Sequence, residues 1–179
     1  EDAIQGAKLL ELTLTARNKN SENPVPMAGI PHHAAQNYID ILVDQGHKVA
    51  IVEQMEDAAV AKGMVKRDVV QLITPGTKLS GGAGSDKQNN YLAAVLPDGQ
   101  AWAMAYIDLS TGELKATTSQ QFNDIVDELR SLEVKEVVLR QNDPETIKQQ
   151  MATQLGEHGL VISTQAEVAP SATISFLTQ

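Results

Sequence analysis

The sequence predicts a mixed α/β fold divided into two domains, and three observations support this prediction. Apolar residues recur at period two in several short segments, as in β-strands. In other segments they recur at i, i+3, i+4 and i+7, as on one face of a helix. Residues 80–85 read Ser-Gly-Gly-Ala-Gly-Ser, a composition typical of a flexible linker. We therefore expect one domain over residues 1–76 and a second over residues 77–179.

The first half predicts a small α+β domain. Alternating Leu and Thr in Leu12–Thr15 indicates a strand, and Gly46 supplies a stop for the helix that runs through Ala35, Tyr38, Ile39 and Leu42. Proline and asparagine mark an exposed loop, and Thr74-Pro75-Gly76-Thr77 reads as a turn. In chain order the expected elements are a helix over 2–11, a strand over 12–15, a loop over 17–26, a helix over 35–45, and strands over 49–52 and 69–73.

The second half predicts a sheet that begins with three antiparallel strands. Pro97-Asp98-Gly99 and Ser110-Thr111-Gly112 are strong hairpin turns, and Phe122–Leu132 has the spacing of an amphipathic helix. The expected elements are strands over 91–96, 101–108 and 113–118, a helix over 122–132, a strand over 134–139, a helix over 144–155 and a strand over 160–163. The order β-β-β-α-β-α-β is that of a ribonuclease-H-like α/β sheet.

Composition excludes several classes of protein. The chain has no cysteine, which removes disulfide scaffolds and thiolate metal sites, and no apolar run approaches the roughly 18 residues of a membrane span. The net charge of −9 argues against a nonspecific polyanion binder. Residues 1–76 carry 10 acids and 7 bases, whereas residues 77–179 carry 13 and 7. A nucleic-acid site would therefore be a local basic patch in the first half.

No catalytic or metal-binding motif is complete in the sequence. Gly81–Lys87 lacks the spacing and the hydroxyl of a phosphate-binding loop, and the adjacent His32 and His33 cannot easily share one metal ion. A two-metal nuclease on a ribonuclease-H-like sheet needs several converging carboxylates, but the strand over 91–96 has none. Asp108 lies at the end of the second strand of that sheet. We expect Asp108 and Ser110 to satisfy backbone groups of a turn.

The basic residues of the first half are the most suggestive candidates. Arg17 and Lys19 share one loop, and Lys62, Lys66 and Arg67 precede the strand over 69–73. Between these groups, Pro26-Met27-Ala28-Gly29-Ile30-Pro31 is a stiff segment of small residues whose backbone can approach a ligand closely. If these loops converge, they form a cationic ledge for phosphates, with Met27 as an apolar contact. The alternative is that they are solvated surface charges around a structural turn.

These same residues carry a resemblance to a known family. The segments PVPMAGIPHHAAQNYIDILVDQGHKVAIVEQMED (24–57) and AKGMVKRDVVQLITPGT (61–77) resemble the bacterial MutS mismatch-repair family. LTLTAR (12–17) and NNYLAAV (89–95) match it in order and spacing. The resemblance implies a partial mismatch-recognition domain over 1–76, followed by a ribonuclease-H-like connector domain over 77–179 that lacks catalytic acids.

The resemblance also implies a DNA-binding role. The family's recognition domain meets DNA from the minor-groove side, and mismatches are selected partly because they are easily kinked and unstacked. The positions implied to support DNA contact are Arg17, Met27, Ala28, Gly29, His33, Lys66 and Arg67. The family's Phe-x-Glu motif, which reads the mispaired base, lies upstream of the equivalent of Glu1, and the phenylalanines present are Phe122 and Phe176. We therefore expect this chain to position DNA without specifying the mismatch.

Further expectations concern a longer protein. Neither end of the sequence has a start or stop signal, so we expect an excised piece, with the connector truncated at its C-terminus. The resemblance implies mismatched double-stranded DNA and a MutL-type protein as partners, a homodimer, and a cytoplasmic, nucleoid-associated location. It places ATP and magnesium in domains outside this chain and leaves no cofactor, metal or enzymatic activity here. Two alternatives stay open: an interaction scaffold without DNA contact and a divergent ribonuclease-H-like nuclease.

Overall fold

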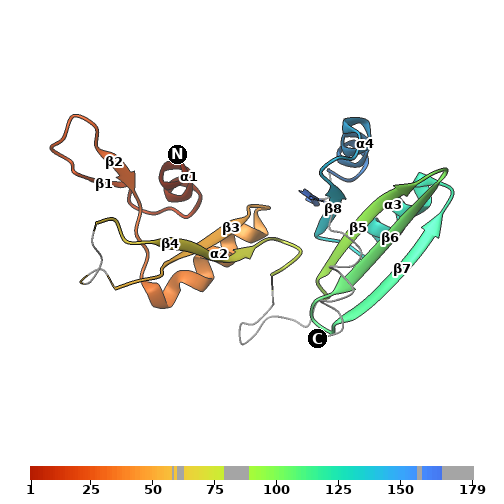
Figure 1. The fold of residues 1–179 in the computed structure, drawn as a ribbon, viewed down its shortest axis with the longest axis horizontal. Coiled ribbons are helices and arrows are strands. Elements are labelled where there is room, and N and C mark those ends of the chain that lie inside the picture. Colours follow the sequence, from red (N-terminus) through yellow and green to blue (C-terminus); the bar gives the residue numbers. More distant parts are fainter. Residues whose placement is uncertain (58, 60–62, 79–88, 157–158, 167–179) are drawn as a thin grey trace. The chain divides into compact units, whose positions relative to one another are not determined.

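The computed structural model describes residues 1–57, 59, 63–78, 89–156 and 159–166. The chain divides into two compact units, Glu1–Thr74 and Pro75–Gln179, hereafter unit 1 and unit 2 (Figure 1). Expectations for Lys62, the Ser80–Ser85 linker and Phe176 fall outside the described residues.

Unit 1 contains two small antiparallel sheets and two helices. The helix α1 (Asp2–Leu9) contacts β2 of the first sheet, which pairs β1 (Thr15–Arg17) with β2 (Val25–Met27). After the short 3-10 helix η1 (His32–Ala34), α2 (Ala35–Asp44) packs on the second sheet, which pairs β3 (Val49–Gln54) with β4 (Arg67–Ile73). In the described part of unit 1, the buried apolar side chains are Ala7, Val43 and Ile73.

The predicted strand over 12–15 is wrong, and the end of α1 explains why. Glu11 has φ 52°, and the Leu12 amide donates to the Ala7 carbonyl at 2.8 Å, the backbone pattern of a Schellman cap. Leu12 therefore ends the helix, and Leu14 remains 46% exposed. The strand begins only at Thr15, and its partner β2 lies in the segment that was expected to be loop and stiff connection.

Caps of the same kind set two other helix ends. Gly46 ends α2 as expected, with φ 83° and the His47 amide donating to the Leu42 carbonyl at 3.0 Å. In unit 2, the Val134 amide donates to the Leu129 carbonyl at 3.1 Å and thereby caps α3. The strand predicted from Val134 consequently begins two residues later.

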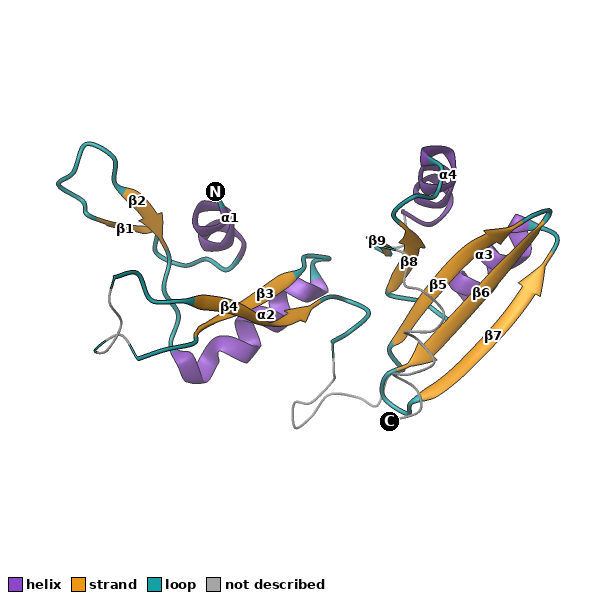
Figure 2. Cartoon of the chain, viewed as in Figure 1, coloured by secondary structure: helices purple, strands orange, loops and turns teal. Residues whose placement is uncertain are grey.

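Unit 2 is a five-stranded sheet with two helices (Figure 2). Its elements are β5 (Tyr91–Asp98), β6 (Ala101–Asp108), β7 (Glu113–Ser119), α3 (Phe122–Ser131), β8 (Glu136–Arg140), α4 (Glu145–Leu155) and β9 (Val161–Gln165). The strand order is β7-β6-β5-β8-β9, with antiparallel pairs on the β7 side and parallel pairs on the β9 side. The predicted order β-β-β-α-β-α-β and the mixed α/β class are confirmed.

One apolar core holds unit 2 together. Alternate residues of β5 and β8, including Val95 and Val137, point to the face that α3 and α4 cover. Leu129 of α3 and Met151 of α4 are 1% and 0% exposed within the same cluster. Both crossover helices therefore pack on one face of the sheet. The single tryptophan, Trp102, borders this core with its ring 4.7 Å from that of Phe122.

Candidate nucleic-acid interface and a buried polar cluster of unit 2

The hairpin β1–β2 carries the first group of candidate residues. Arg17 pairs with Val25, and Thr15 pairs with Met27, so Arg17 and Met27 lie at opposite ends of a three-residue ladder. Pro26 sits in the middle of β2, a position that a strand at a sheet edge tolerates. The turn after Arg17 is closed by Ser21, whose amide and hydroxyl both donate to the Asn18 carbonyl. The Arg17 side chain is exposed, and Met27 is 46% exposed.

The segment after the hairpin presents backbone to solvent. Gly29 is exposed, and a Cβ atom added there would meet no other atom within 4 Å. Ala28 is half-buried, whereas Ile30 is 38% exposed. His33 lies in η1, whose first turn is closed by the Ala34 amide donating to the Pro31 carbonyl at 3.0 Å. Met27, Gly29 and His33 thus follow one exposed stretch of chain.

The start of β4 carries the second group. Arg67 pairs with Gln54 of β3, and just before it the Met55 amide donates to the Lys66 carbonyl at 3.0 Å. The Lys66 amide donates to Glu56 at 2.7 Å, which places a carboxylate beside this end of the sheet. Asp68 follows Arg67 directly and pairs with Glu53. Lys66 and Arg67 therefore lie among acidic groups, a setting that their sequence positions did not indicate.

The two groups lie on different sheets of unit 1. The hairpin brings Arg17 and Met27 onto one ladder, and Ala28, Gly29 and His33 follow it in the chain. Lys66 and Arg67 lie on the β3–β4 sheet. Within the described part of the chain, no hydrogen bond or ion pair joins one group to the other, and no ion pair holds the Arg17, Lys66 or Arg67 side chain. Their charged ends are available to a ligand.

A buried polar cluster fastens the junction segment Pro75–Lys78 to the sheet of unit 2. The Gly76 amide donates to Glu136 Oε2 at 3.0 Å, and the Ser163 hydroxyl donates to Glu136 Oε1. Glu136 is 3% exposed, so its carboxylate depends on these donors. The side-chain amide of Asn90 donates to the carbonyls of Pro75 and Lys78, at 3.2 and 2.7 Å. This clasp therefore uses Gly76, Asn90, Glu136 and Ser163.

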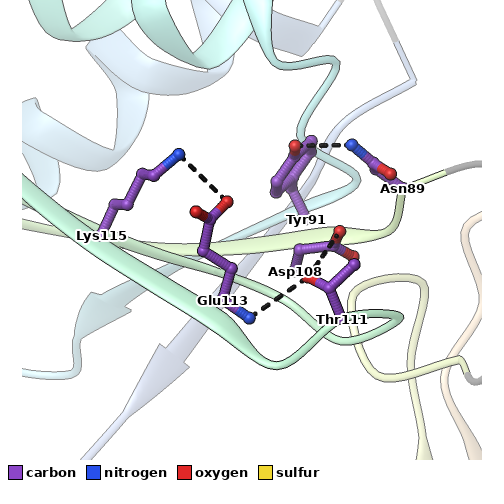
Figure 3. A network of polar contacts seen from close by, with 6 residues as sticks. All are labelled: Asn89, Tyr91, Asp108, Thr111, Glu113 and Lys115. Atoms are coloured by element: carbon purple, nitrogen blue, oxygen red, sulfur yellow. Dashed lines mark hydrogen bonds and ion pairs between the residues drawn. The ribbon is translucent and has the colours of Figure 1, made fainter.

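Asp108 organises the turn next to this clasp. Its Oδ1 accepts from the amides of Asn90 and Ser110, at 3.2 and 2.9 Å, and from the Ser110 hydroxyl at 2.8 Å. Its Oδ2 accepts from Thr111 Oγ1 at 3.1 Å (Figure 3). Burial by itself raises the pKa of Asp108, but the hydrogen bonds from Ser110, Asn90 and Thr111 outweigh it and hold the pKa below its ordinary value. The expectation that Asp108 satisfies backbone groups of the turn is confirmed. The Ser110 hydroxyl instead donates to the Asp108 carboxylate.

The polar network continues along β7. The Glu113 amide donates to Thr111 Oγ1 at 3.2 Å, and Lys115 Nζ lies 3.0 Å from Glu113 Oε2 (Figure 3). The hydrogen bond and the charge of Glu113 raise the pKa of Lys115, so Lys115 stays protonated. Asn89 donates to the Tyr91 hydroxyl at 2.7 Å in the same view. Asp108 and Glu113 thus each have a hydrogen-bond or ion-pair partner within unit 2.

Sequence reasoning missed the clasp. The available signal was Glu136, an acidic residue directly before the apolar run Val137–Leu139, because a charge buried in such a place requires partners. Nothing in the sequence indicated that one of these partners would be the amide of Gly76, which precedes it by 60 residues.

Each unit matches a known protein-family model. A family model described as MutS domain I matches residues 1–81, and a second, MutS domain II, matches residues 90–172. The chain belongs to the MutS family. The first match contains the hairpin and the start of β4, and the second contains the whole five-stranded sheet. The predicted resemblance to MutS is thereby confirmed.

Curated MutS relatives match over most or all of the chain. It is 78% identical over 179 residues to the DNA mismatch repair protein MutS of Leuconostoc citreum, which is 100% of this chain and 21% of that protein. It is 75% identical over 179 residues to the MutS protein of Leuconostoc mesenteroides, again 100% of this chain and 21% of the relative. It is 47% identical over 167 residues to that of Streptococcus pneumoniae, covering 93% and 19% of the two chains. The chain thus spans about a fifth of the length of these relatives.

The described residues lack two further features. None of the helices has the length and apolar character to cross a bilayer. No three histidine, aspartate or glutamate side chains in these residues are grouped so that they could hold a metal ion.

Proposed function

We propose that this chain is the DNA-positioning and connector part of a mismatch-repair protein. The observation that supports the proposal most is the match of the whole chain to proteins named DNA mismatch repair protein MutS. Unit 1 holds mismatched or looped duplex DNA through its exposed hairpin and the start of β4. Unit 2 couples the state of the bound DNA to ATPase domains outside this chain, where ATP and magnesium act.

The proposed contacts follow from exposure and charge. Arg17, Lys66 and Arg67 are exposed and reach the sugar-phosphate backbone, which attracts cations irrespective of sequence. Met27 lies exposed at the end of the hairpin, where an apolar side chain can rest against the sugars of a minor groove. Gly29 leaves room for a close approach of the DNA backbone. Ala28 and His33 belong to the same segment after the hairpin and contribute to the same contact surface. These contacts position DNA without specifying the mismatched base.

The partners of the longer protein extend this proposal. Unit 2 offers a surface to a MutL-type repair protein, and the acidic bias of residues 77–179, with 13 acids and 7 bases, suits a protein partner better than DNA. We place the longer protein as a homodimer in the bacterial cytoplasm, at the nucleoid. A scaffold without DNA contact is the rival function, and DNA titration separates the two.

The decisive titration compares a G·T-mismatched duplex with its matched control. Fluorescence anisotropy at low salt is expected to give weak binding of similar affinity to both duplexes, because phosphate contacts carry no sequence information. Clear preference for the mismatch would contradict a purely positioning role of these contacts. Absence of any DNA binding would favour the scaffold.

Charge reversal tests the arginines directly. Arg17→Glu or Arg67→Glu is expected to weaken binding to both duplexes and to reduce the slope of log affinity against log salt by about 1 for each residue. Lys48→Glu, which changes an exposed lysine between α2 and β3, is the matched control and is expected to have a smaller effect. Equal effects of all three variants would mean that only the net charge of the chain matters, and the assigned contacts would be wrong.

Gly29→Ala separates binding from folding. Because the added methyl group meets no atom of the chain within 4 Å, the free energy of unfolding is expected to change by less than about 0.5 kcal/mol. A DNA backbone in close approach would meet this methyl group, so affinity in the same anisotropy assay is expected to fall. Unchanged affinity would remove Gly29 from the interface.

A further inference from the structure

The outer edge of β7 is open. Within the described residues, β7 pairs with β6 on one side and with no strand on the other. Its residues are exposed from Glu113 to Thr118. An edge strand directs the N–H and C=O groups of alternate residues outward, where they can pair with another extended chain. The charges that commonly protect such an edge lie in its first half, at Glu113 and Lys115, whereas Ala116–Ser119 is uncharged.

One side of this edge is an acidic groove. A hollow of about 470 Å³ lies between β7 and α3, and Tyr106, Lys115, Ser119, Asp124 and Glu128 line it. Lys115 is already paired with Glu113, at 3.0 Å. The two carboxylates of α3 therefore give the groove an excess of negative charge. The Ser119 hydroxyl donates to Asp124 at 2.5 Å, which ties the end of β7 to the first turn of α3.

The opposite face beside the same edge is apolar. A second hollow, of about 310 Å³, is lined by small and aliphatic side chains of β5, β6 and β7, including Ala94, Leu96, Ala103 and Ala116. Cross-strand register places Ala103 opposite Thr118 and Ala105 opposite Ala116, on the face that α3 does not cover. Leu96 and Leu114 remain 39% and 65% exposed.

Both hollows border the same three residues of β7, Ala116–Thr118. A strand added beside them would direct successive side chains alternately to the acidic groove and to the apolar hollow. We propose that the outer edge of β7 binds an extended peptide segment of a partner protein in which basic and apolar residues alternate. Main-chain hydrogen bonds supply the affinity, and the two hollows supply the specificity.

This inference deepens the partner-binding part of the proposed function and rests on it for its biological meaning. Its test contains no DNA and no intact partner. A failure of peptide binding would therefore leave the DNA titration untouched, and a failure of DNA binding would leave the peptide result standing.

The probe is a capped nonapeptide of alternating lysine and valine, labelled with fluorescein and titrated with the 179-residue chain. Two further peptides carry N-methyl groups on the lysine amides or on the valine amides. Because only one set of alternate amides faces β7 in an added strand, one methylated peptide is expected to lose at least tenfold in affinity while the other stays within about threefold. Equal behaviour of both methylated peptides, or no binding of the parent peptide, would overturn the proposal.

Two charge variants on α3 locate the site. Glu128→Lys is expected to weaken binding at least fivefold, because Glu128 lines the groove. Asp127→Lys, on the same helix but outside the groove lining, is expected to change it less than twofold. Circular dichroism of both variants controls for folding, and amide chemical shifts of the unaltered chain should move in β7 and α3 on titration. Equal losses in the two variants, or shifts confined to β9, would overturn the proposal.

Discussion

Gly76→Ala is expected to destabilise unit 2 by about 2–3 kcal/mol, since overpacking and the loss of a buried hydrogen bond act together. The added Cβ would lie 2.7 Å from both Glu136 Cβ and Leu92 Cδ1. The leucine methyl group can move aside, but Glu136 Cβ is fixed to the backbone of β8. The junction segment must then lift from the sheet, which breaks the hydrogen bond from the Gly76 amide to Glu136. The buried carboxylate would lose one of its donors.

Urea unfolding followed by tryptophan fluorescence measures this effect, because the single tryptophan, Trp102, belongs to unit 2. Gly156→Ala is the matched control in the same unit: a Cβ there meets no atom within 4 Å, and its φ of −63° suits alanine. It should leave the midpoint unchanged or raise it slightly. If the two variants unfolded alike, the close contact at Gly76 would not be a feature of the protein in solution.

Asp108→Ala is expected to lower the Tm of unit 2 by about 5–10 °C, because several donors lose their acceptor at once. The Asn90 and Ser110 amides and the hydroxyls of Ser110 and Thr111 all donate to this carboxylate. The measurement is thermal unfolding followed by Trp102 fluorescence. Asp98→Ala, at the exposed end of β5, is the control and should shift the Tm by less than about 2 °C.

The stabilisation by Asp108 is expected to depend on pH. The pKa of Asp108 is lowered in the folded protein, so its contribution is present above the ordinary value of 3.8 and is lost as the pH falls through the folded pKa. The difference in Tm between the parent chain and Asp108→Asn should therefore be constant from pH 7 to about pH 5 and shrink below about pH 4. A difference that grows on acidification would contradict a lowered pKa.

Unit 2 could be predicted from the sequence because its signals are local and mutually consistent. Ala93 and Val95 alternate into the core, and the spacing of Ile125, Val126 and Leu129 leaves one apolar face on α3, so each element has one favourable placement. Unit 1 was harder. The alternation in Leu12–Thr15 predicts a strand, whereas in the structure Leu12 completes the cap of α1. The observed ladder β1–β2 includes a proline, which is unusual in a strand.

The candidate site was predictable only in part. Arg17, Met27 and Arg67 are exposed, as the polar and proline-containing sequence around them predicts. Their placement on separate sheets depends on pairing between segments that are distant in sequence. The acidic neighbours of Lys66 and Arg67 depend on the register of β3 against β4, which a bulge between Ile51 and Val52 shifts. The clasp depends on a contact across 60 residues, which no local pattern contains.

The span of that contact has a consequence for the order in which the molecule forms. β5, β6 and β7 are neighbours in sequence and can pair as a meander within microseconds to milliseconds, since their loops are short. β8 reaches the other side of β5 only after the α3 crossover is complete, and Ser163 arrives later still. During synthesis, the junction segment leaves the ribosome long before its acceptor Glu136 exists. The clasp therefore closes late in folding. In stopped-flow unfolding and refolding, Gly76→Ala should unfold faster than the parent chain and refold at a nearly unchanged rate.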